Sequence, residues 1–376
     1  MISFDSGTGL QQYGKGGLPP DWPGGFWWHW LVFTVIIMAF VLTLVIGFIW
    51  FERRALGRMQ ARLGPNRVGP FGLFQAFADA LKVLIKEDIV PDQADKIVHW
   101  LAPIVAFVPA LMIFAVVPFQ NGALLADLNI GVLYVIAISS VSTLGIFMAG
   151  WASNNKYTLL GAMRDVASVV SYEIPVVLSL TGIILLSGSL SLNDIVQSQN
   201  RSVPFFLLQP LGFFLFFIGG LAEINRSPFD LLEADSEIVA GFHTEYSGMK
   251  FALFYLVEYA EALAFSALVS VFFLGGWGGP VLPPWLWLVV KIWGVFFVIC
   301  WIRATMPRVR IDQLMALSWK FLFPLALLNL VITAAEVIIW PAALPPILIP
   351  ANIAIAVGLI LLLSRQFKLG WGKVEV

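Results

Sequence analysis

The chain has 376 residues, of which 59% are hydrophobic and only 12% are charged, and its formal net charge is −1. Soluble proteins carry about 25% charged residues, so this composition excludes a soluble globular protein and indicates a polytopic membrane protein. The net charge gives no indication of nucleic-acid binding, and the chain has no basic nucleic-acid motif.

Residues that hold redox cofactors or metals are sparse. Cys300 is the single cysteine, and it cannot hold an iron–sulfur cluster alone. The three histidines, His29, His99 and His243, lack metal-ligand spacing. No Gly-rich phosphate loop follows a strand-like segment. We therefore expect no redox cofactor and no metal site on this chain.

Apolar runs of membrane-spanning length follow an N-terminal segment. Residues 1–25 are rich in Gly and Pro and lack the features of a signal peptide, so they are predicted to be an external segment. Nine later runs each suit a bilayer of ~30 Å. They are 26–50, 100–119, 131–151, 166–188, 204–222, 251–275, 285–304, 320–340 and 346–364. The last two predictions are the weakest, because four prolines lie at their junction.

The length and uniform apolarity of these runs favour helices over a strand barrel. The predicted fold class is therefore an all-α polytopic membrane protein. It has about nine transmembrane helices in one domain, 26–364.

The distribution of Lys and Arg predicts the orientation. With the N-terminus outside, 19 basic residues face the cytoplasm, Lys15 and Arg201 face outward, and Lys291 lies within a span. The positive-inside rule therefore places the segments 51–98 and 223–250 and the tail 365–376 in the cytoplasm.

The first cytoplasmic segment, 51–98, begins as a basic continuation of the first span. After a Gly/Pro turn from Gly64 to Gly72, apolar residues recur at spacings of three and four, beginning with Phe71, Phe74 and Phe77. This pattern predicts an amphipathic helix lying at the cytoplasmic membrane interface. The basic residues Arg53 to Arg67 also suit a topology anchor that contacts anionic lipid.

The stretch 221–261 holds eight of the chain's 23 carboxylates between long apolar runs. Glu233 and Glu237 are four residues apart and would share one helix face. Carboxylates at such depth usually mark ion or proton routes. A solvated cytoplasmic loop is the alternative for this cluster. That alternative suits Glu258 and Glu261 less well, because both lie inside the sixth predicted span.

Glu173 lies in the fourth predicted span, with Asp165 near its cytoplasmic end. It is a candidate for a proton route, and a polar clamp between helices is the alternative. Glu336 and Lys291 lie near enough to a helix end or a partner to be structural.

Several motifs resemble one known family. FERRALGRMQARLGPNRVGPFG, ADALKVLIKED, GWASNNKY, SYE, AEINRSPFDLLEADSEIVAGFHTEYSGMKFALFYLVEY and IRATMPRVRIDQLM occur in this order. They closely resemble the H subunits of bacterial proton-pumping NADH:quinone oxidoreductase, or complex I, whose mitochondrial counterpart is subunit 1. The similarity extends from about residue 26 to 335.

The resemblance implies a subunit of a respiratory-chain translocase in the bacterial plasma (inner) membrane. It would form the quinone-access chamber and link quinone reduction to proton translocation through a chain of carboxylates. The implied proton pathway comprises Glu173, Glu223, Glu233, Asp235, Glu237, Glu245 and Glu258. The implied quinone chamber comprises Arg53, Arg62, Asp79, Phe229 and Arg303.

The resemblance also implies partners. The quinone, ubiquinone or menaquinone, is a substrate, and FMN and iron–sulfur clusters are expected on soluble partner subunits at the cytoplasmic face. Small membrane subunits and antiporter-like subunits would lie laterally. The second to sixth spans are expected to form a bundle like half of an antiporter unit.

Four features depart from the family pattern. Asp235 stands where Glu is common, and Leu232 where Pro is common. Ser140 stands where some bacterial relatives carry an acid, so the route there would need water or another carboxylate. The ninth span is additional to the usual eight, although some bacterial members share it.

Three alternatives stay open from the sequence. The chain could be the related membrane subunit of a membrane-bound hydrogenase or of a ferredoxin-driven quinone reductase. It could be a stand-alone proton-coupled transporter, or a passive anchor for a soluble arm. Co-purifying flavin and iron–sulfur subunits would distinguish these classes.

Overall fold

The computed structural model describes residues 27–121, 124–230, 241–340 and 348–366, and these are helical with no strand among them. Seven helical stretches in this part are long and apolar enough to cross a membrane. They are Leu31–Met59, Lys96–Ala115, Gly131–Ala152, Lys156–Ser187, Gly248–Phe273, Pro284–Thr305 and Ile311–Ile339. Two shorter apolar helices match the remaining two predicted runs. The prediction of an all-α polytopic membrane protein is confirmed.

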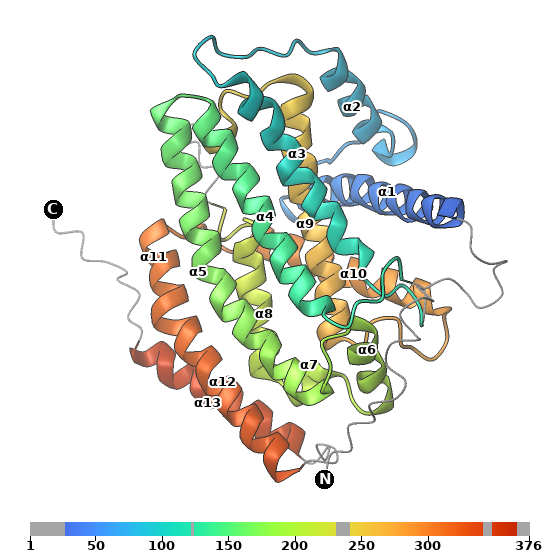
Figure 1. Ribbon diagram of the computed structural model, residues 1–376, viewed down its shortest axis with the longest axis vertical. Coiled ribbons are helices and arrows are strands. Elements are labelled where there is room, and N and C mark those ends of the chain that lie inside the picture. The colour runs from blue at the N-terminus through green and yellow to red at the C-terminus, as the bar shows by residue number, and fades with distance from the viewer. Residues whose placement is uncertain (1–26, 122–123, 231–240, 341–347, 367–376) are drawn as a thin grey trace.

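Figure 1 shows the order of the elements. The α-helices are α1 (Trp27–Met59), α2 (Gln75–Ile85), α3 (Lys96–Met112), α4 (Gly131–Ala152), α5 (Lys156–Ser187), α6 (Leu192–Arg201), α7 (Phe205–Leu208), α8 (Pro210–Glu223), α9 (Gly248–Phe273), α10 (Pro284–Thr305), α11 (Ile311–Ala316), α12 (Phe323–Ile339) and α13 (Ile349–Gln366). Short 3-10 turns are η2 (Pro70–Gly72), η3 (Ile113–Ala115) and η4 (Gly241–His243), and η5 (Leu317–Leu322) is a π-helical turn.

Two predicted boundaries are wrong for identifiable reasons. The fourth span begins as a helix at Lys156, ten residues early, because the Asn155 side chain caps it by accepting the Tyr157 N–H at 3.0 Å. The fifth run is interrupted at Gln209, which separates α7 from α8. Pro210 disfavours helical backbone in the residue that precedes it.

The eighth span also begins earlier than predicted, at Ile311, and it passes through the π-helical turn η5 before α12. Pro324 lies in the first turn of α12. Proline lacks the N–H that a regular helix would pair with the preceding turn, and a π-helical turn is one way to accommodate such a break.

Five helices, α3, α4, α5, α8 and α9, pack against one another in the middle of the molecule (Figure 1). Small residues permit close contact between α3 and α4. A Cβ atom added at Gly145 would lie 2.5 Å from the Ala106 backbone nitrogen. Helix α1 packs against α9 and α10, and α12 packs against α5.

Helix α2 (Gln75–Ile85) corresponds to the amphipathic helix that the sequence predicts, but it begins at Gln75. Phe71 and Phe74, which the pattern assigned to the helix, belong to the preceding turn, where Phe71 has φ 58°. None of the α2 residues is buried, and Phe77, Leu81 and Leu84 are exposed. The helix therefore presents an apolar surface beside α1 and α9, its packing partners.

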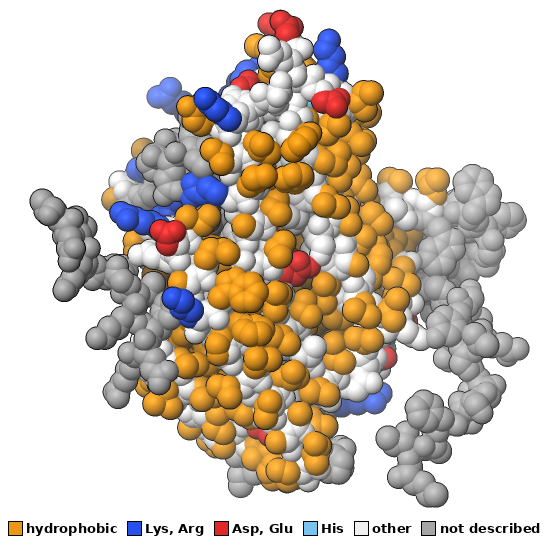
Figure 2. All heavy atoms as spheres, turned by 60° about the vertical axis from the view of Figure 1, so that its left-hand side comes forward, with side chains coloured by type: hydrophobic (Ala, Val, Ile, Leu, Met, Phe, Trp, Pro, Cys, Tyr) orange, Lys and Arg blue, Asp and Glu red, His pale blue; other side chains and the backbone are white. Residues whose placement is uncertain are grey.

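Figure 2 shows a broad outer face covered mainly by hydrophobic side chains, with most of the visible basic side chains gathered toward one end. A face of this kind suits contact with lipid, and its basic end suits the cytoplasmic interface. Helices α2 and α6 lie toward opposite ends of the molecule (Figure 1).

Candidate functional site

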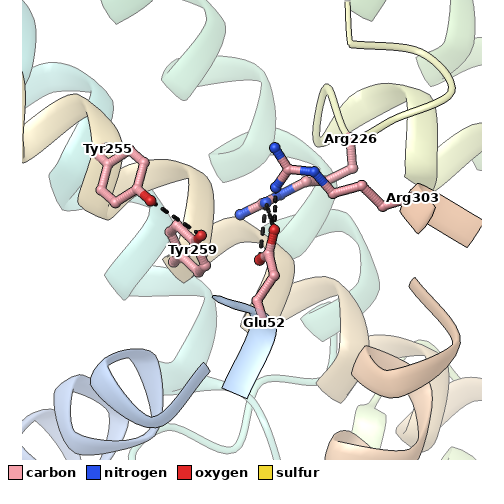
Figure 3. A network of polar contacts seen from close by, with 5 residues as sticks. All are labelled: Glu52, Arg226, Tyr255, Tyr259 and Arg303. Carbon is pink, nitrogen blue, oxygen red and sulfur yellow. Dashed lines mark hydrogen bonds and ion pairs between the residues drawn. The ribbon is translucent and has the colours of Figure 1, made fainter. Parts of the chain in front are cut away.

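A buried ion cluster lies where α1, α10 and the segment after α8 meet (Figure 3). The Arg226 Nη1 group donates to both carboxylate oxygens of Glu52, at 3.0 and 3.1 Å, and Arg303 pairs with the same carboxylate. Glu52 is 2% exposed and Arg226 is 4% exposed. Breaking such a pair typically costs about 3–5 kcal/mol, because it leaves one charge buried and uncompensated.

The cluster continues onto α9 through two tyrosines. The Arg226 guanidinium lies over the Tyr259 ring, 4.4 Å from its centroid, and the Tyr255 and Tyr259 hydroxyls are 3.2 Å apart. Burial alone would lower the pKa of Arg226, but the negative charge of Glu52 raises it above its ordinary value. Arg226 therefore stays cationic and holds this group together.

A second pair ties α1 to the interfacial helix. Arg53 forms an ion pair with Asp79 of α2 and interacts electrostatically with Tyr255 of α9. Gln75 Nε2 also donates to Asp79, at 3.1 Å. Partial burial raises the pKa of Asp79, but the hydrogen bond and charge of Arg53 outweigh burial and lower it overall. Asp79 is therefore an anion at neutral pH.

A cavity of about 80 Å³ lies among α3, α4, α5, α8 and α9. Its acidic lining residues are Glu173, Glu223 and Glu261. Phe216, Phe265 and other apolar side chains form most of its wall, and no Lys, Arg or His is among the described residues that line it. A water molecule needs roughly 10–15 Å³ of such space and two or more polar partners, so the cavity has room for a few waters.

Hydroxyl groups of α4 contact all three cavity carboxylates. Ser140 donates to Glu173, Ser142 Oγ donates to Glu261 Oε1 at 2.5 Å, and Ser139, whose Oγ donates to the Ile136 carbonyl at 3.0 Å, lies close to Glu223. Ser140, which the sequence analysis noted as a departure from the family pattern, donates its hydroxyl hydrogen to Glu173 on the neighbouring helix α5. These contacts place a row of hydroxyl and carboxyl groups inside the helix bundle.

The ion cluster and the cavity share two elements. Helix α9 carries Tyr255 and Tyr259 on the cluster side and Glu261 in the cavity. The end of α8 carries Glu223 in the cavity, three residues before Arg226 in the cluster. The ion cluster and the cavity are therefore separated by only a few residues along each of these two segments.

The other predicted site residues lie apart from the cavity. Glu245 accepts the Asn155 Nδ2–H at 2.8 Å beside a surface groove of about 810 Å³. Glu258 is half-buried and interacts electrostatically with Arg226. Arg62 is exposed in the turn after α1, and Phe229 is buried with its ring 5.8 Å from that of Tyr172.

Part of the predicted acid route lies outside the described residues. This applies to Glu233, Asp235, Glu237 and the departure at Leu232, all within 231–240. The N-terminal residues 1–26 and the tail from 367 onward are outside as well.

Sequence reasoning assigned no role to several residues that the structure brings into the site: Glu52, Tyr255, Tyr259, Arg226, Ser139 and Ser142. It noted Glu261 only as a carboxylate inside the sixth predicted span. One available signal was a single glutamate before a row of arginines at the end of an apolar run. Another was Arg226, one of only two basic residues in the acidic stretch. In the described part of the chain, no three potential metal ligands come together.

Comparison with known proteins identifies a consistent set of relatives. The sequence profile of the NADH dehydrogenase family matches residues 32–334. The NADH-quinone oxidoreductase H subunit of Dehalococcoides mccartyi (strain CBDB1) is 62% identical over 351 residues, 93% of this chain and 99% of the relative. The H subunit of Brevibacillus brevis is 48% identical over 85% of this chain and 95% of its own length. That of Geobacillus kaustophilus is 51% identical over 80% and 91%.

Proposed function

The chain belongs to the family of NADH-quinone oxidoreductase H subunits, and we propose that it forms the quinone-access chamber and passes protons along a row of carboxylates. It is a membrane subunit of a multi-subunit oxidoreductase rather than a complete enzyme. FMN and the iron–sulfur clusters are assigned to partner subunits, which deliver electrons to the quinone at the cytoplasmic face.

The surroundings of α2 support the quinone chamber. A quinone combines an apolar tail with a polar head, so it needs an apolar path from lipid that ends at polar groups. The exposed apolar side chains of α2 offer such a path, and the Arg53–Asp79 pair lies beside it. Arg53 interacts with Tyr255, and the Tyr255 hydroxyl contacts that of Tyr259, which borders the ion cluster.

The observation that carries the proposal is that the same two segments of the chain contribute residues to the ion cluster and to the cavity. Reduction of a quinone to a quinol takes up two electrons and two protons, and the electrons place negative charge at the head group until the protons arrive. The cluster is electrostatically sensitive because it is buried. Helix α9 and the 223–226 segment extend from the cluster to Glu261 and Glu223 in the cavity.

The cavity supports proton movement. Three carboxylates and three hydroxyl side chains, those of Ser139, Ser142 and Thr143, surround space for water. Such groups accept and release protons, and intramembrane acids facing a polar cavity are functional candidates. Glu173 and Glu223 are therefore placed in the route, and Glu245 and Glu258 extend it toward the cytoplasmic side.

The quinone chamber is tested by replacing the arginine of the Arg53–Asp79 pair. Arg53→Ala should lower NADH:quinone reductase activity by at least about tenfold, since a hydrogen bond to a charged group contributes about 1.5–3 kcal/mol. Reduction of an artificial soluble acceptor should stay near the native rate. The measurement compares both activities in the purified complex.

Arg67→Ala is the matched control, because Arg67 is an exposed arginine of the same basic segment. It should leave both activities within about twofold of the native complex. Equal loss of both activities in Arg53→Ala would indicate failed assembly, and native quinone reduction in that variant would exclude Arg53 from the chamber.

The proposed role of Glu233, Asp235 and Glu237 in the proton route is tested by removing their charge without changing their shape. Replacing Glu233, Asp235 and Glu237 together by their amides should lower quinone reduction and proton pumping in an assembled complex. Asp235→Glu should be tolerated, because it restores the family's usual residue. Full pumping per electron by the triple variant, with normal subunit content on a native gel, would exclude the loop from the route.

A further inference from the structure

Glu261 is the one cavity carboxylate that the family resemblance does not assign to the proton route. It extends from α9 into the cavity that also contains Glu173 on α5 and Glu223 at the end of α8. The residue is half-buried, and the helix around it is otherwise almost entirely buried. Burying a glutamate inside a membrane helix costs free energy, and glutamates found there are usually functional.

The hydrogen bond from Ser142 defines how Glu261 is held. Ser142 Oγ donates to Glu261 Oε1 at 2.5 Å, across the contact between α4 and α9. This bond occupies one carboxyl oxygen as an acceptor and orients the group. The second oxygen remains available to hold or release a proton, and the cavity has room for the water that would carry it.

Glu261 also interacts electrostatically with carboxylates on two sides. These are Glu223 in the cavity and Asp165 on α5, and the cation of Arg226 in the ion cluster also acts on Glu261. Asp165 is 1% exposed, and its polar neighbour is Asn225, which directly precedes Arg226 of the ion cluster. Glu261 therefore lines the cavity and also interacts with charged groups on the side of the ion cluster.

Three carboxylates with no cation in the lining form a coupled system. If all three were ionised, they would repel one another strongly in a medium of low dielectric constant. Whether Glu261 holds a proton therefore depends on the charge of Glu223 and of its other charged neighbours. Such a group can pass a proton in response to a nearby change of charge.

On the basis of the proposed function, we propose that Glu261 is a proton-carrying carboxylate that exchanges protons with Glu223 through cavity water. In one step, the acid form of Glu261 gives its proton to a water molecule, that water passes a proton to the Glu223 carboxylate, and Glu261 becomes the anion. Ser142 is a positioning residue that keeps Glu261 turned into the cavity. Asp165 extends the row toward Arg226.

The test uses Glu261→Gln in the intact, purified complex. The amide keeps the shape and can accept the Ser142 hydrogen bond, but it cannot carry a proton. Quinone reduction and pumping should fall together by about tenfold, less than the 10²–10⁴-fold of a fully lost proton transfer because water offers a partial bypass. Redox-induced infrared difference spectra should lose a carboxylic C=O band that shifts in D₂O.

Glu336→Gln is the matched control, because Glu336 is a half-buried glutamate in a membrane helix, near Asn352 and away from this cavity. It should leave activity, pumping and the infrared band unchanged. Native pumping and an unchanged band in Glu261→Gln would overturn the proposal. A polar clamp between α4 and α9 predicts that outcome, because the amide preserves the hydrogen bond.

Two further variants keep the result decisive. If Glu261→Gln fails to assemble, Ser142→Ala provides the test. This variant should shift the pH profile of quinone reduction, and an unshifted profile overturns the proposal.

Glu223→Gln distinguishes a failure of the Glu261 proposal from a failure of the proposed function. If Glu223→Gln lowers pumping while Glu261→Gln pumps at the native rate, only the role of Glu261 is excluded. If both variants pump at the native rate, the cavity is excluded from the proton route.

Discussion

At the scale of single residues, the site depends on charges that the fold has removed from water. Glu52 is the anion between two arginines, Arg226 and Arg303, and it comes from a helix 174 residues away from Arg226 in the chain. Cys300 is 1% exposed and interacts electrostatically with Glu52. The reactivity of this single cysteine therefore reports whether the cluster is closed.

Glu52→Gln should open the cluster. The substitution preserves shape but leaves Arg226 without its closest anion, at a cost of about 3–5 kcal/mol. Modification of Cys300 by a thiol reagent should then be faster by on the order of 10²-fold, if local opening limits the reaction. Mass spectrometry of the Cys300 peptide over time gives the rate.

Glu87→Gln is the control for this measurement, because Glu87 is exposed and distant in sequence from the cluster. The rate of Cys300 modification in Glu87→Gln should match that in the native complex. A native rate in Glu52→Gln would mean that Glu52 contributes little to holding α1 against α10.

At the scale of elements, the turn between α1 and α2 determines where the interfacial helix lies. Gly69 and Gly72 adopt φ of 73° and 75°, and Phe71 also has positive φ. Trp50 Nε1 and Arg54 Nη1 both donate to the Phe71 carbonyl at 3.1 Å, and they attach the turn to α1. The docking of α2 beside the Arg53–Asp79 pair depends on this local backbone.

Gly72→Ala should loosen α2. An added Cβ would lie 2.2 Å from the Pro65 carbonyl oxygen, and the positive φ adds a cost of about 1–3 kcal/mol. Amide hydrogen exchange in 75–85 should rise, and quinone reduction should fall severalfold. Gly294→Ala is the matched control and should be neutral, because the added Cβ would meet no atom within 4 Å beyond its own stretch of helix. Unchanged exchange in Gly72→Ala would show that the turn adapts freely.

The segment η4 and the residues after it should be sensitive to acid. The His243 ring lies 5.1 Å from Phe242 and 5.3 Å from Phe251, and burial lowers the pKa of His243 below its ordinary value of 6.5. The charge of Asp230 opposes this shift but does not reverse it. As the pH falls below 6.5, the opened segment takes up a proton that the folded segment does not, so folding is destabilised.

Hydrogen exchange in 241–246, corrected for its intrinsic pH dependence, should therefore be faster at about pH 5.5 than at about pH 7.5. His243→Gln cannot titrate, and it should remove most of the difference. An equal pH dependence in the native chain and in this variant would assign the effect to another group.

At the scale of the whole molecule, charge and hydrophobic surface agree with one orientation. The predicted cytoplasmic segments carry 19 basic residues, against two in the external segments. Arg201 is the last residue of α6, and Asp88 follows α2. Both side chains are exposed, so both are accessible to labelling.

The orientation is tested by single cysteines in a Cys300→Ala background. An impermeant maleimide should label Arg201→Cys in intact cells, and it should label Asp88→Cys only after the cells are opened. A cysteine at position 15 should behave like the one at 201. Labelling of Asp88→Cys in intact cells would reverse the predicted topology.

The sequence by itself determined the class of this protein and the approximate extent of its helices. Lipid offers no hydrogen bonds, so each span must be a long apolar helix, and that requirement is visible locally along the chain. The ends of α5, α8 and α11 were harder to predict, because caps, prolines and a π-helical turn shift them. The motifs of 51–98 and 221–261 also identified the family, and with it the candidate residues Arg53, Asp79, Glu173 and Glu223.

Only the tertiary structure decided which of those residues meet. Glu173, Glu223 and Glu261 come from three helices and share one cavity, whereas Glu245 lies beside a separate surface groove. The pairing of Glu52 with Arg226 likewise joins distant parts of the chain. Helical periodicity indicates which face a residue occupies within its own helix. Which faces oppose one another follows from helix packing, to which small residues such as Gly145 contribute, and this depends on the whole set of neighbours at once.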